Sequence, residues 1–341
     1  MGNFDKDIAH IVYASDDRFA EILAVSLVSL YENSRDMEEI IVYVLDSGIL
    51  PENRKKIDSI SRDYGRSVPV WIMAKNISNE LRMEVSTDRG SLSQYARLFL
   101  SSTLPGNLER VLYLDCDTLI CRSIRELWNL EMHGRTVAAL MDAFSKYYRK
   151  NIGLRPDDVM FNSGVMLVDL TRWKEQHVEK RLLEFISRKN GRIQQGDQGA
   201  LNAILSHDTY CFEPRFNSVT IFYDFNFEEM MAYRRPPRFY SEEEVRKAVE
   251  EPNIVHFTSS FLSKRPWVKG CRHRYMEEWM KYRQMTAWKD EELREENICE
   301  WKKVITKILM KLPSNIMLRI VSIPQIYLRP FWFKVLNMMY F

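Results

Sequence analysis

The first half of the chain alternates short apolar runs with longer amphipathic stretches. Three runs rich in Ile, Val and Tyr predict β-strands at residues 8–15, 40–48 and 68–74. Between them, apolar residues recur at helical spacing over 18–34 and 52–65. This alternation of strand and helix predicts a parallel, doubly wound sheet, a fold that binds its ligands at the carboxyl ends of the strands.

The second half continues the alternation. Further strands are expected at 110–114, 136–142, 162–170 and 253–259. Helices are expected at 91–105, 171–191 and 196–206. Beyond Trp267 the chain becomes charged and helical in pattern. The pattern therefore predicts an α/β protein with a helical C-terminal region.

The length and composition are those of a folded protein of enzyme size. The 341 residues are 45% hydrophobic and 28% charged, and 12 Gly and 12 Pro leave little room for a disordered or repetitive chain. The five Cys are an odd number without C-x-x-C spacing, so neither a disulfide framework nor a structural zinc site is expected. The start of the chain lacks the pattern of a signal peptide, which favours a cytoplasmic location.

Charge is distributed unevenly along the chain. Residues 301–341 hold 7 Lys and Arg and no Asp or Glu, whereas residues 1–300 hold 42 basic and 47 acidic side chains. A mildly acidic body argues against binding of nucleic acid. A basic tail places any attraction to anionic surfaces at the C-terminus.

This tail mixes basic, aromatic and apolar residues. No window of eighteen apolar residues in it is free of charge, and Pro313, Pro324 and Pro330 are expected to break its helix. We therefore expect residues 301–341 to lie in the interface of an anionic membrane and to attach the protein peripherally to the inner face of the cell membrane. The alternative is a helical hairpin that packs on the body or on a second subunit, which leaves a homodimer open.

Two carboxylates follow a strongly apolar strand in RVLYLDCDTLI, residues 110–120. Side chains of a strand alternate between faces, so Asp115 and Asp117 are expected to converge while Cys116 points away and packs. Two like charges at the end of a buried strand cost free energy unless a cation or hydrogen-bond donors compensate them. Mn²⁺ or Mg²⁺ suits carboxylates that also hold phosphate. His256, at the end of a late strand, would complete the shell and favour Mn²⁺.

Five sequence blocks, in order, resemble family 8 glycosyltransferases, the group that includes glycogenin and bacterial lipopolysaccharide α-galactosyl- and α-glucosyltransferases. The blocks are IVYASDDRFA, SQYARLFLSS, RVLYLDCDTLI, FNSGVMLVDLTRW with GDQGALN, and VHFTSSFLSKRPW. The resemblance implies a GT-A fold, a Rossmann-like mixed sheet flanked by helices, over residues 1–270, with 271–341 as a helical extension. It also implies a nucleotide-sugar donor, Mn²⁺ and transfer with retention of the anomeric configuration.

The resemblance further implies which residues contact the UDP-sugar. The expected set is Tyr13, Ala14, Asp16, Arg18, Arg97, Asp115, Cys116, Asn162, Ser163, Ser259, Lys264 and Arg265. From the residues alone, Asp16 could instead cap a helix and Arg97 could pair with a neighbouring acid. The segment R-P-W at 265–267 stands where the family has K-P-W, so either Lys264 or Arg265 would contact the pyrophosphate. Gly164 is expected to let the backbone come close.

The expected catalytic residues are Asp142, Asp197 and Gln198. By resemblance, Asp142 and Asp197 bind hydroxyls of the donor sugar, and Gln198 lies near the anomeric carbon. An amide is a poor nucleophile. We therefore expect a front-face reaction with an oxocarbenium-like transition state, in which the leaving phosphate helps to deprotonate the acceptor hydroxyl.

The sequence thus predicts a metal-dependent transferase that moves glucose or galactose from a UDP-sugar to a glycan or glycolipid acceptor. A nucleotidyl- or phosphotransferase would use a similar acidic pair, but neither G-x-G-x-x-G nor G-x-x-x-x-G-K-[ST] occurs in the chain. The other alternative is a non-catalytic scaffold that binds nucleotide sugars. The intact set of acidic and amide residues argues against such a loss of activity.

Overall fold

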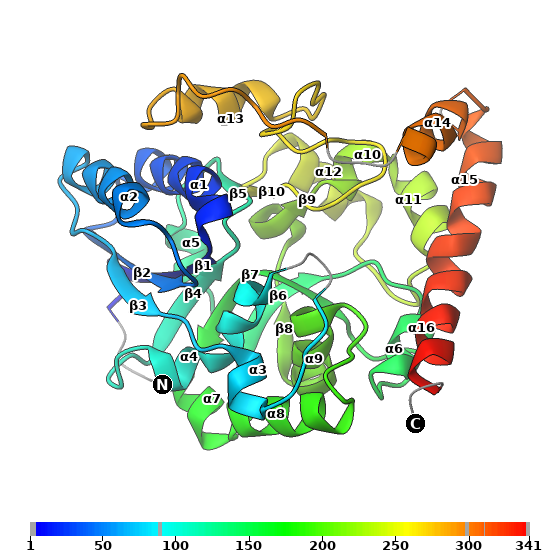
Figure 1. Cartoon of the computed structure of the whole chain (residues 1–341), viewed down its shortest axis with the longest axis horizontal. Coiled ribbons are helices and arrows are strands. Elements are labelled where there is room, and N and C mark those ends of the chain that lie inside the picture. The colour runs from blue at the N-terminus through cyan, green and yellow to red at the C-terminus, as the bar shows by residue number, and fades with distance from the viewer. Residues whose placement is uncertain (1–4, 88–90, 297–299, 310, 339–341) are drawn as a thin grey trace.

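A computed structural model describes residues 5–87, 91–296, 300–309 and 311–338 of the chain. Its centre is a seven-stranded sheet (Figure 1). The strands, in spatial order, are β3 (Val70–Met73), β2 (Glu39–Asp46), β1 (Ile8–Ser15), β4 (Arg110–Leu114), β7 (Phe161–Asp169), β6 (Val137–Met141) and β8 (Thr209–Cys211). The strands expected from the apolar runs are all present.

The direction of the strands makes this a mixed sheet. Strands β3, β2, β1 and β4 are parallel to one another, as the alternation of strand and helix predicts. Strand β7 runs antiparallel between β4 and β6. The fold is therefore the expected Rossmann-like mixed sheet, and the carboxyl ends of β1 and β4 lie at one edge of it.

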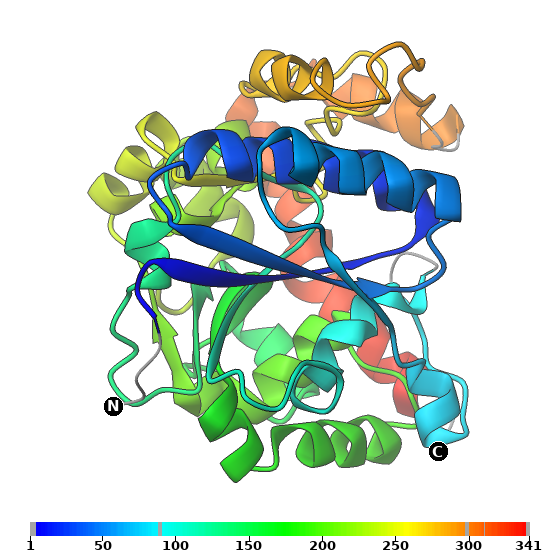
Figure 2. The same ribbon diagram turned by 90° about the vertical axis from the view of Figure 1, so that its left-hand side faces the viewer.

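Helices cover both faces of the sheet (Figure 2). One face packs against α1 (Ala20–Asn33) and α2 (Pro51–Asp63). The other face packs against α7 (Leu170–Glu175), α8 (Val178–Arg188) and α9 (Gly196–Leu205). Because both faces are covered, strand residues on both sides are buried, which explains why the parallel strands read as nearly continuous apolar runs.

A second, three-stranded sheet lies beside the first, and of its strands only the one within 253–259 was expected. It consists of β5 (Thr118–Ile120), β10 (Ile254–His256) and β9 (Ser218–Val219). Strand β10 pairs antiparallel with β5, so that His256 lies opposite Thr118. This pairing brings a histidine from late in the chain next to the residues that follow β4.

The remaining helices are short and lie around the two sheets. They are α3 (Ile77–Leu81), α5 (Arg125–Trp128), α6 (Lys146–Asn151), α10 (Ile221–Asp224), α11 (Phe227–Arg234), α12 (Glu242–Glu250) and α13 (Met276–Arg283). Short 3-10 turns, η1 (Asp17–Phe19), η3 (Ser206–Asp208) and η4 (Pro214–Asn217), connect the elements.

Two expected helices differ from the prediction. The stretch 91–105 is mostly a 3-10 helix, η2 (Leu92–Phe99), followed by the short α4 (Leu100–Thr103). The stretch 171–191 is broken at His177, whose φ of 52° ends α7 before α8 begins. The break has a visible cause, because the buried positions Trp173 and Val178 are out of phase with a single 3.6-residue period.

The C-terminal region forms a long helical rod, residues 314–338, along one side of the molecule (Figure 1). After α14 (Glu300–Leu309) the chain continues as α15 (Ser314–Ile323), a π-helical turn η5 (Pro324–Leu328) and α16 (Arg329–Met338). The expectation that the prolines would break this helix is wrong for Pro324 and Pro330. Pro313 lies at the N-terminal boundary of α15, where a missing N–H costs nothing.

The rod tolerates its prolines because α6 and the residue before it supply the missing hydrogen bonds. Pro330 has no N–H to donate to the preceding turn, which leaves main-chain carbonyls there without a helical partner. The Tyr148 hydroxyl donates to the Gln325 carbonyl at 2.9 Å, and the Ser145 hydroxyl donates to the Ile326 carbonyl at 3.1 Å. The rod is therefore fixed to the segment that follows β6.

Residues beyond 270 share the core of the main fold. Trp279, Tyr282, Trp288 and Met317 belong to the same buried cluster as the apolar face of α1. A buried ion pair, Arg283 to Glu21 at 2.7 Å, joins α13 to α1. Among the described residues, no helix is both long and apolar enough to cross a membrane.

Candidate functional site

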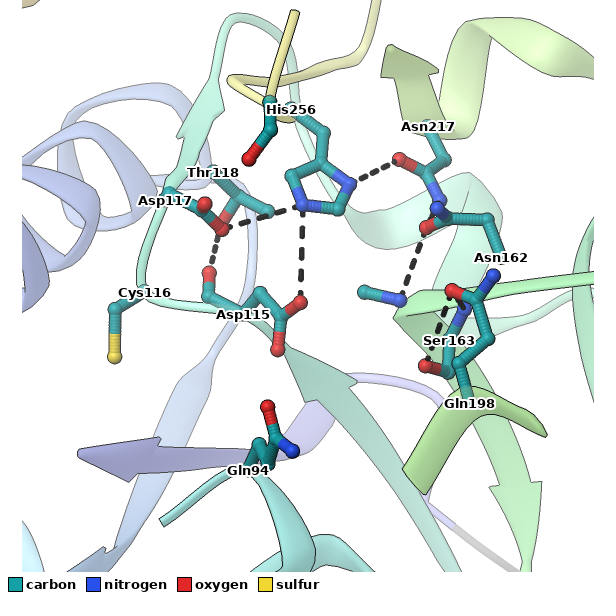
Figure 3. A network of polar contacts seen from close by, with 12 residues as sticks. Gln94, Asp115, Cys116, Asp117, Thr118, Asn162, Ser163, Gln198, Asn217 and His256 are labelled. Carbon is teal, nitrogen blue, oxygen red and sulfur yellow. Dashed lines mark hydrogen bonds and ion pairs between the residues drawn. The ribbon is translucent and has the colours of Figure 1, made fainter. Parts of the chain in front are cut away.

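The two carboxylates of the D-x-D segment lie in a turn and not in a strand. Strand β4 ends at Leu114, and the Thr118 N–H donates to the Asp115 carbonyl at 3.2 Å to close the turn before β5. The prediction that Asp115 and Asp117 converge is confirmed, but its reason, alternation along a strand, is wrong. Cys116 points away from the pair, as expected, and its thiol donates to the Ala14 carbonyl at 3.3 Å (Figure 3).

His256 completes a set of three converging ligand atoms. Its Nε2 lies 3.2 Å from Asp117 Oδ1 and 3.7 Å from Asp115 Oδ2, and the ligand atoms of the three residues lie within 4.8 Å of one another. Two carboxylates and an imidazole form a donor set that fits a divalent cation. Gly164 keeps the space open, because a Cβ at that position would lie 2.1 Å from His256 Cε1 and 2.9 Å from Asp115 Oδ2.

Arg97 links this acidic turn to the start of α9. Its guanidinium lies 2.6 Å from Asp115 and 3.0 Å from Asp197, and it donates to the Ser163 carbonyl at 2.8 Å. Burial alone would lower the pKa of Arg97, but the neighbouring carboxylates, Asp115 first, hold it above its ordinary value. A permanently charged, planar donor therefore compensates two carboxylates that are far apart in the sequence.

Gln198 is held at both ends of its amide group. Its Nε2 donates to Asp142 Oδ2 at 3.2 Å, and its Oε1 accepts from the Ser163 N–H at 3.2 Å. Asn162 also donates to Asp142, at 3.4 Å. The three expected catalytic residues, Asp142, Asp197 and Gln198, thus lie in one network with Arg97 and with Asn162 and Ser163 of β7.

A cavity of about 310 Å³ lies in front of this network. The expected site residues that line it are Ala14, Asp16, Arg18, Arg97, Asp115, Cys116, Asp117, Ser163, Asp197 and Gln198. Asp16 Oδ2 accepts from Ser91 at 2.8 Å and from Arg18 at 2.9 Å. Its buried Oδ1 has no partner among the residues that the structure describes, so it can accept a hydrogen bond from a ligand. Asp16 is an N-cap by position only, since its side chain makes no capping bond.

The expectation for Tyr13 needs correction. Its side chain is completely buried, and its hydroxyl bonds to Ser26 at 3.1 Å inside the core. Burial raises the pKa of this phenol well above its ordinary value. Tyr13 therefore supports the end of β1 from behind and does not present its ring to the cavity.

The side chains of the neighbouring residues Lys264 and Arg265 point to different partners. Arg265 lies 3.5 Å from Asp117 Oδ2 and donates to Ser259 Oγ at 2.9 Å. Lys264 instead pairs with Glu296 at 3.0 Å. Of the two, Arg265 is the cation placed beside the acidic turn.

Asn217 and Arg294 are among the residues of the site that were not anticipated. Asn217, at the end of η4, has its Oδ1 3.0 Å from Nδ1 of His256. Arg294 lines the cavity, and its guanidinium donates to the Arg18 carbonyl at 2.7 Å. For Asn217 the sequence offers only its position before a short strand, and for Arg294 it offers no signal, because the contact joins segments more than 270 residues apart.

The sequence comparison decides the family. The model described as Glycosyl transferase family 8 matches residues 10–271. The chain is a family 8 glycosyltransferase. The glycosyltransferase is 30% identical over 285 residues to general stress protein A of Bacillus subtilis (strain 168), an alignment that covers 83% of this chain and 95% of the relative. It is 22% identical over 310 residues to lipopolysaccharide 1,2-glucosyltransferase of Escherichia coli (strain K12), covering 89% and 86% of the two chains.

Solved structures agree with the fold of this glycosyltransferase. The galactosyltransferase LgtC, in complex with donor and acceptor sugar analogs, superposes with a TM-score of 0.68 at 24% identity. The match covers 86% of this chain and 99% of LgtC. The GT-A fold is therefore shared over nearly the whole of that enzyme.

Proposed function

We propose that this glycosyltransferase moves a hexose, glucose or galactose, from a UDP-sugar to a glycan or glycolipid acceptor with retention of configuration. The observation that supports this most is the convergence of Asp115, Asp117 and His256 beside a cavity that Asp197 and Gln198 also line. The three converging residues would hold Mn²⁺ or Mg²⁺. A bound divalent cation supplies positive charge that stabilises the departing diphosphate.

The charges along the cavity suit a nucleoside diphosphate sugar. At one end, Asp16 Oδ1 would accept a hydrogen bond from the base or the ribose. Beside the acidic turn, Arg265 would donate to the diphosphate, which carries the negative charge that develops as the sugar leaves. At the other end, Asp197 and Asp142 would accept hydrogen bonds from hydroxyls of the sugar. Bound in this way, the donor would have its anomeric carbon near Gln198.

The Gln198 amide favours a front-face reaction. Its oxygen already accepts from the Ser163 N–H and its nitrogen donates to Asp142, so the amide is oriented by two fixed partners. An amide oxygen that accepts a backbone hydrogen bond is a still poorer nucleophile. The acceptor oxygen would therefore bond to the anomeric carbon on the face from which the diphosphate departs, and the departing phosphate would take the hydroxyl proton.

Binding of UDP in the presence of Mn²⁺ tests the metal site. We expect the affinity of the wild-type chain for UDP, measured by calorimetry, to rise with Mn²⁺, and we expect Asp117→Asn to lose most of that rise. Asp63→Asn, a change at an exposed carboxylate of α2, is the matched control and should behave as wild type. If Asp117→Asn kept the full Mn²⁺ dependence, the assignment of the acidic turn would be wrong.

Turnover tests the role of Gln198 separately from binding. UDP-glucose and UDP-galactose would be screened for metal-dependent release of UDP. For Gln198→Ala we expect kcat to fall by about 100-fold, the effect of removing a group placed at developing charge, with UDP affinity within about threefold of wild type. Equal kcat in the two proteins would remove Gln198 from the reaction centre.

The outer face of the C-terminal rod supports the proposal that the protein also binds a membrane surface. Its exposed apolar side chains are Ile316, Ile320, Ile323, Tyr327, Leu328, Phe331 and Trp332. Exposed Lys311, Arg319, Arg329 and Lys334 accompany them. An apolar helix face with basic neighbours fits the interface of an anionic bilayer. Co-sedimentation of the full chain with vesicles measures this binding, and failure to pellet with anionic vesicles would contradict it.

A further inference from the structure

A buried row of amide side chains connects His256 to Asp142. Figure 3 shows its part from His256 through Asn217 to Asn162. His256 Nδ1 lies 3.0 Å from Asn217 Oδ1. Asn217 Nδ2 in turn donates to Asn162 Oδ1 at 3.0 Å, and Asn162 Nδ2 donates to Asp142 Oδ2 at 3.4 Å. Asn217 is completely buried, and His256 and Asn162 are nearly so. The row therefore runs through the interior from the acidic turn to the expected sugar site.

The chemistry at one end fixes the direction of every hydrogen bond in this row. The Gly164 N–H, which can only donate, points at Asn162 Oδ1 at 3.0 Å. A carboxylate can only accept, so Asp142 requires the Nδ2 side of the same amide. Both neighbours thus demand one orientation of Asn162. Its Oδ1 then requires a donor from Asn217, which must turn Nδ2 toward it.

The orientation of Asn217 determines the state of the imidazole. With Nδ2 committed to Asn162, Asn217 presents Oδ1 to His256, and an amide oxygen can only accept. Nδ1 of His256 must therefore carry a hydrogen. Nε2, the nitrogen that faces Asp115 and Asp117, is then the one left to offer a lone pair.

We propose that Asn217 is a positioning residue of the metal site: it holds His256 in the tautomer with hydrogen on Nδ1, so that Nε2 can ligate a divalent cation between the two carboxylates. The proposal deepens the proposed function and rests on the divalent site within it. Its physical basis is general, since a ligating imidazole needs its other nitrogen fixed by an acceptor.

Loss of the acceptor would favour the wrong tautomer. A neutral His256 without Asn217 Oδ1 can place its hydrogen on Nε2 and donate to Asp117 Oδ1, only 3.2 Å away. Cation binding would then have to break that hydrogen bond and move the hydrogen. Partners of this kind are worth 10- to 100-fold in metal affinity.

Two substitutions of Asn217 separate positioning from packing. Asn217→Leu removes the acceptor, and we expect Mn²⁺ affinity, measured by the electron paramagnetic resonance of free Mn²⁺, to fall about 10- to 100-fold. Asn217→Asp keeps an acceptor for Nδ1 but faces Asn162 Oδ1 with a second acceptor. We expect this variant to bind Mn²⁺ within about threefold of wild type, although it is the less stable of the two by thermal unfolding.

The outcomes are distinct. A purely structural role predicts that Asn217→Asp loses at least as much Mn²⁺ affinity as Asn217→Leu, and that result would overturn the proposal. Unchanged affinity in Asn217→Leu would also overturn it.

Nitrogen-15 chemical shifts of His256 in the metal-free wild-type protein give a measurement that needs no cation. At about pH 8, where a free imidazole is neutral, Nδ1 should still carry hydrogen. An Nδ1 without hydrogen would overturn the inference. If wild type bound no Mn²⁺ but Nδ1 were protonated, the divalent site of the proposed function would fail while the tautomer assignment held.

Discussion

Arg97 shows how single residues organise this site. It is nearly buried, and its guanidinium contacts carboxylates from the turn after β4 and from the start of α9. Without it, Asp115 and Asp197 would bring like charges together inside the protein. Such a cation has a stabilising role even before any ligand binds, so its effect on folding can be measured apart from its effect on donor binding.

We expect Arg97→Met to lower the free energy of unfolding by about 3–5 kcal/mol, because removing one partner leaves buried charges uncompensated. Urea unfolding followed by circular dichroism measures the change. The control is Arg246→Met, since Arg246 is half exposed and pairs with Glu243 and Glu250 on the surface of α12. The control should lose no more than about 1 kcal/mol. Equal losses in the two variants would show that Arg97 is not a buried counter-ion.

His273 gives a second measurable effect at the scale of one residue, far from the acidic turn in sequence. It is buried against the rings of Tyr223 and Phe257, and burial lowers its pKa from 6.5 to about 4. Between these two pH values the unfolded chain binds a proton that the folded chain does not. The free energy of unfolding therefore rises with pH in this interval, and the contribution is lost as the pH falls.

The size of the His273 effect follows from the shift in pKa. Wild type should lose about 3 kcal/mol more than His273→Phe on going from pH 7 to pH 4. Urea unfolding of both proteins at several pH values measures the difference, in which contributions common to the two proteins cancel. Identical pH dependence in the two proteins would mean that His273 titrates alike in the folded and unfolded chains.

Residue-level prediction from sequence succeeded where chemistry was local and failed where it depended on packing. Asp115 and Asp117 are two residues apart, and His256 ends an apolar run, so their types and positions pointed to a cation site. Tyr13 belongs to the same block as Asp16, but only the fold shows that its ring faces the core. Asn217 contacts His256 across two elements, and nothing in its neighbours along the chain indicates that contact.

Among the secondary-structure elements, the strands of the central sheet were predicted best. The strands flanked by helices on both faces are mostly apolar and were recognised as such, β1 with its bounds of Ile8 and Ser15. Strand β10 was expected within 253–259, but its partners β5 and β9 were missed, because strands of two or three residues carry too little pattern. The rod was predicted to break at its prolines, because the hydroxyls that bond its carbonyls belong to a segment far away in sequence.

The attachment of the rod can be tested at this scale. Tyr148→Phe removes one hydrogen bond to the π-helical turn, and we expect amide hydrogen exchange in residues 314–335 to become about tenfold faster, since an unsatisfied buried carbonyl costs about 1–3 kcal/mol. Tyr147→Phe is the control, because that side chain is 41% exposed and the variant keeps the tilted contact of its ring with Tyr327. Equal exchange rates in wild type and Tyr148→Phe would show that the hydrogen bond does not hold the rod.

At the scale of the whole molecule, the rod has two different faces. Its inner side contributes Met317, Leu318 and Ile326 to the buried interior, and its outer side is apolar and exposed. Deleting the rod would therefore expose part of the core and, at the same time, remove any membrane-binding face. A change in vesicle binding after such a deletion could have either cause. The rod is also hydrogen-bonded to Ser145 and Tyr148, in the segment that follows Asp142. A membrane bound by the rod would therefore lie on the same side of the molecule as that segment.

Point substitutions on the outer face give the sharper test of membrane binding. Phe331 and Trp332 are 61% and 62% exposed, and their transfer into a bilayer interface would contribute about 2–3 kcal/mol together. We expect the double variant Phe331→Ser/Trp332→Ser to bind vesicles with one-third anionic lipid roughly 30-fold more weakly than wild type. Val70→Ser/Met73→Ser, on the exposed edge strand β3, is the matched control and should bind as wild type.

The salt dependence of vesicle binding distinguishes the contribution of the basic side chains from that of the apolar ones. Exposed Lys311, Arg319, Arg329 and Lys334 attract anionic headgroups, so binding should weaken as ionic strength shortens the Debye length. The loss caused by Phe331→Ser/Trp332→Ser should persist at high salt, because it is apolar in origin. If this variant pelleted like wild type but changed from dimer to monomer in sedimentation velocity without vesicles, the outer face would bind a second copy of the chain and not a membrane.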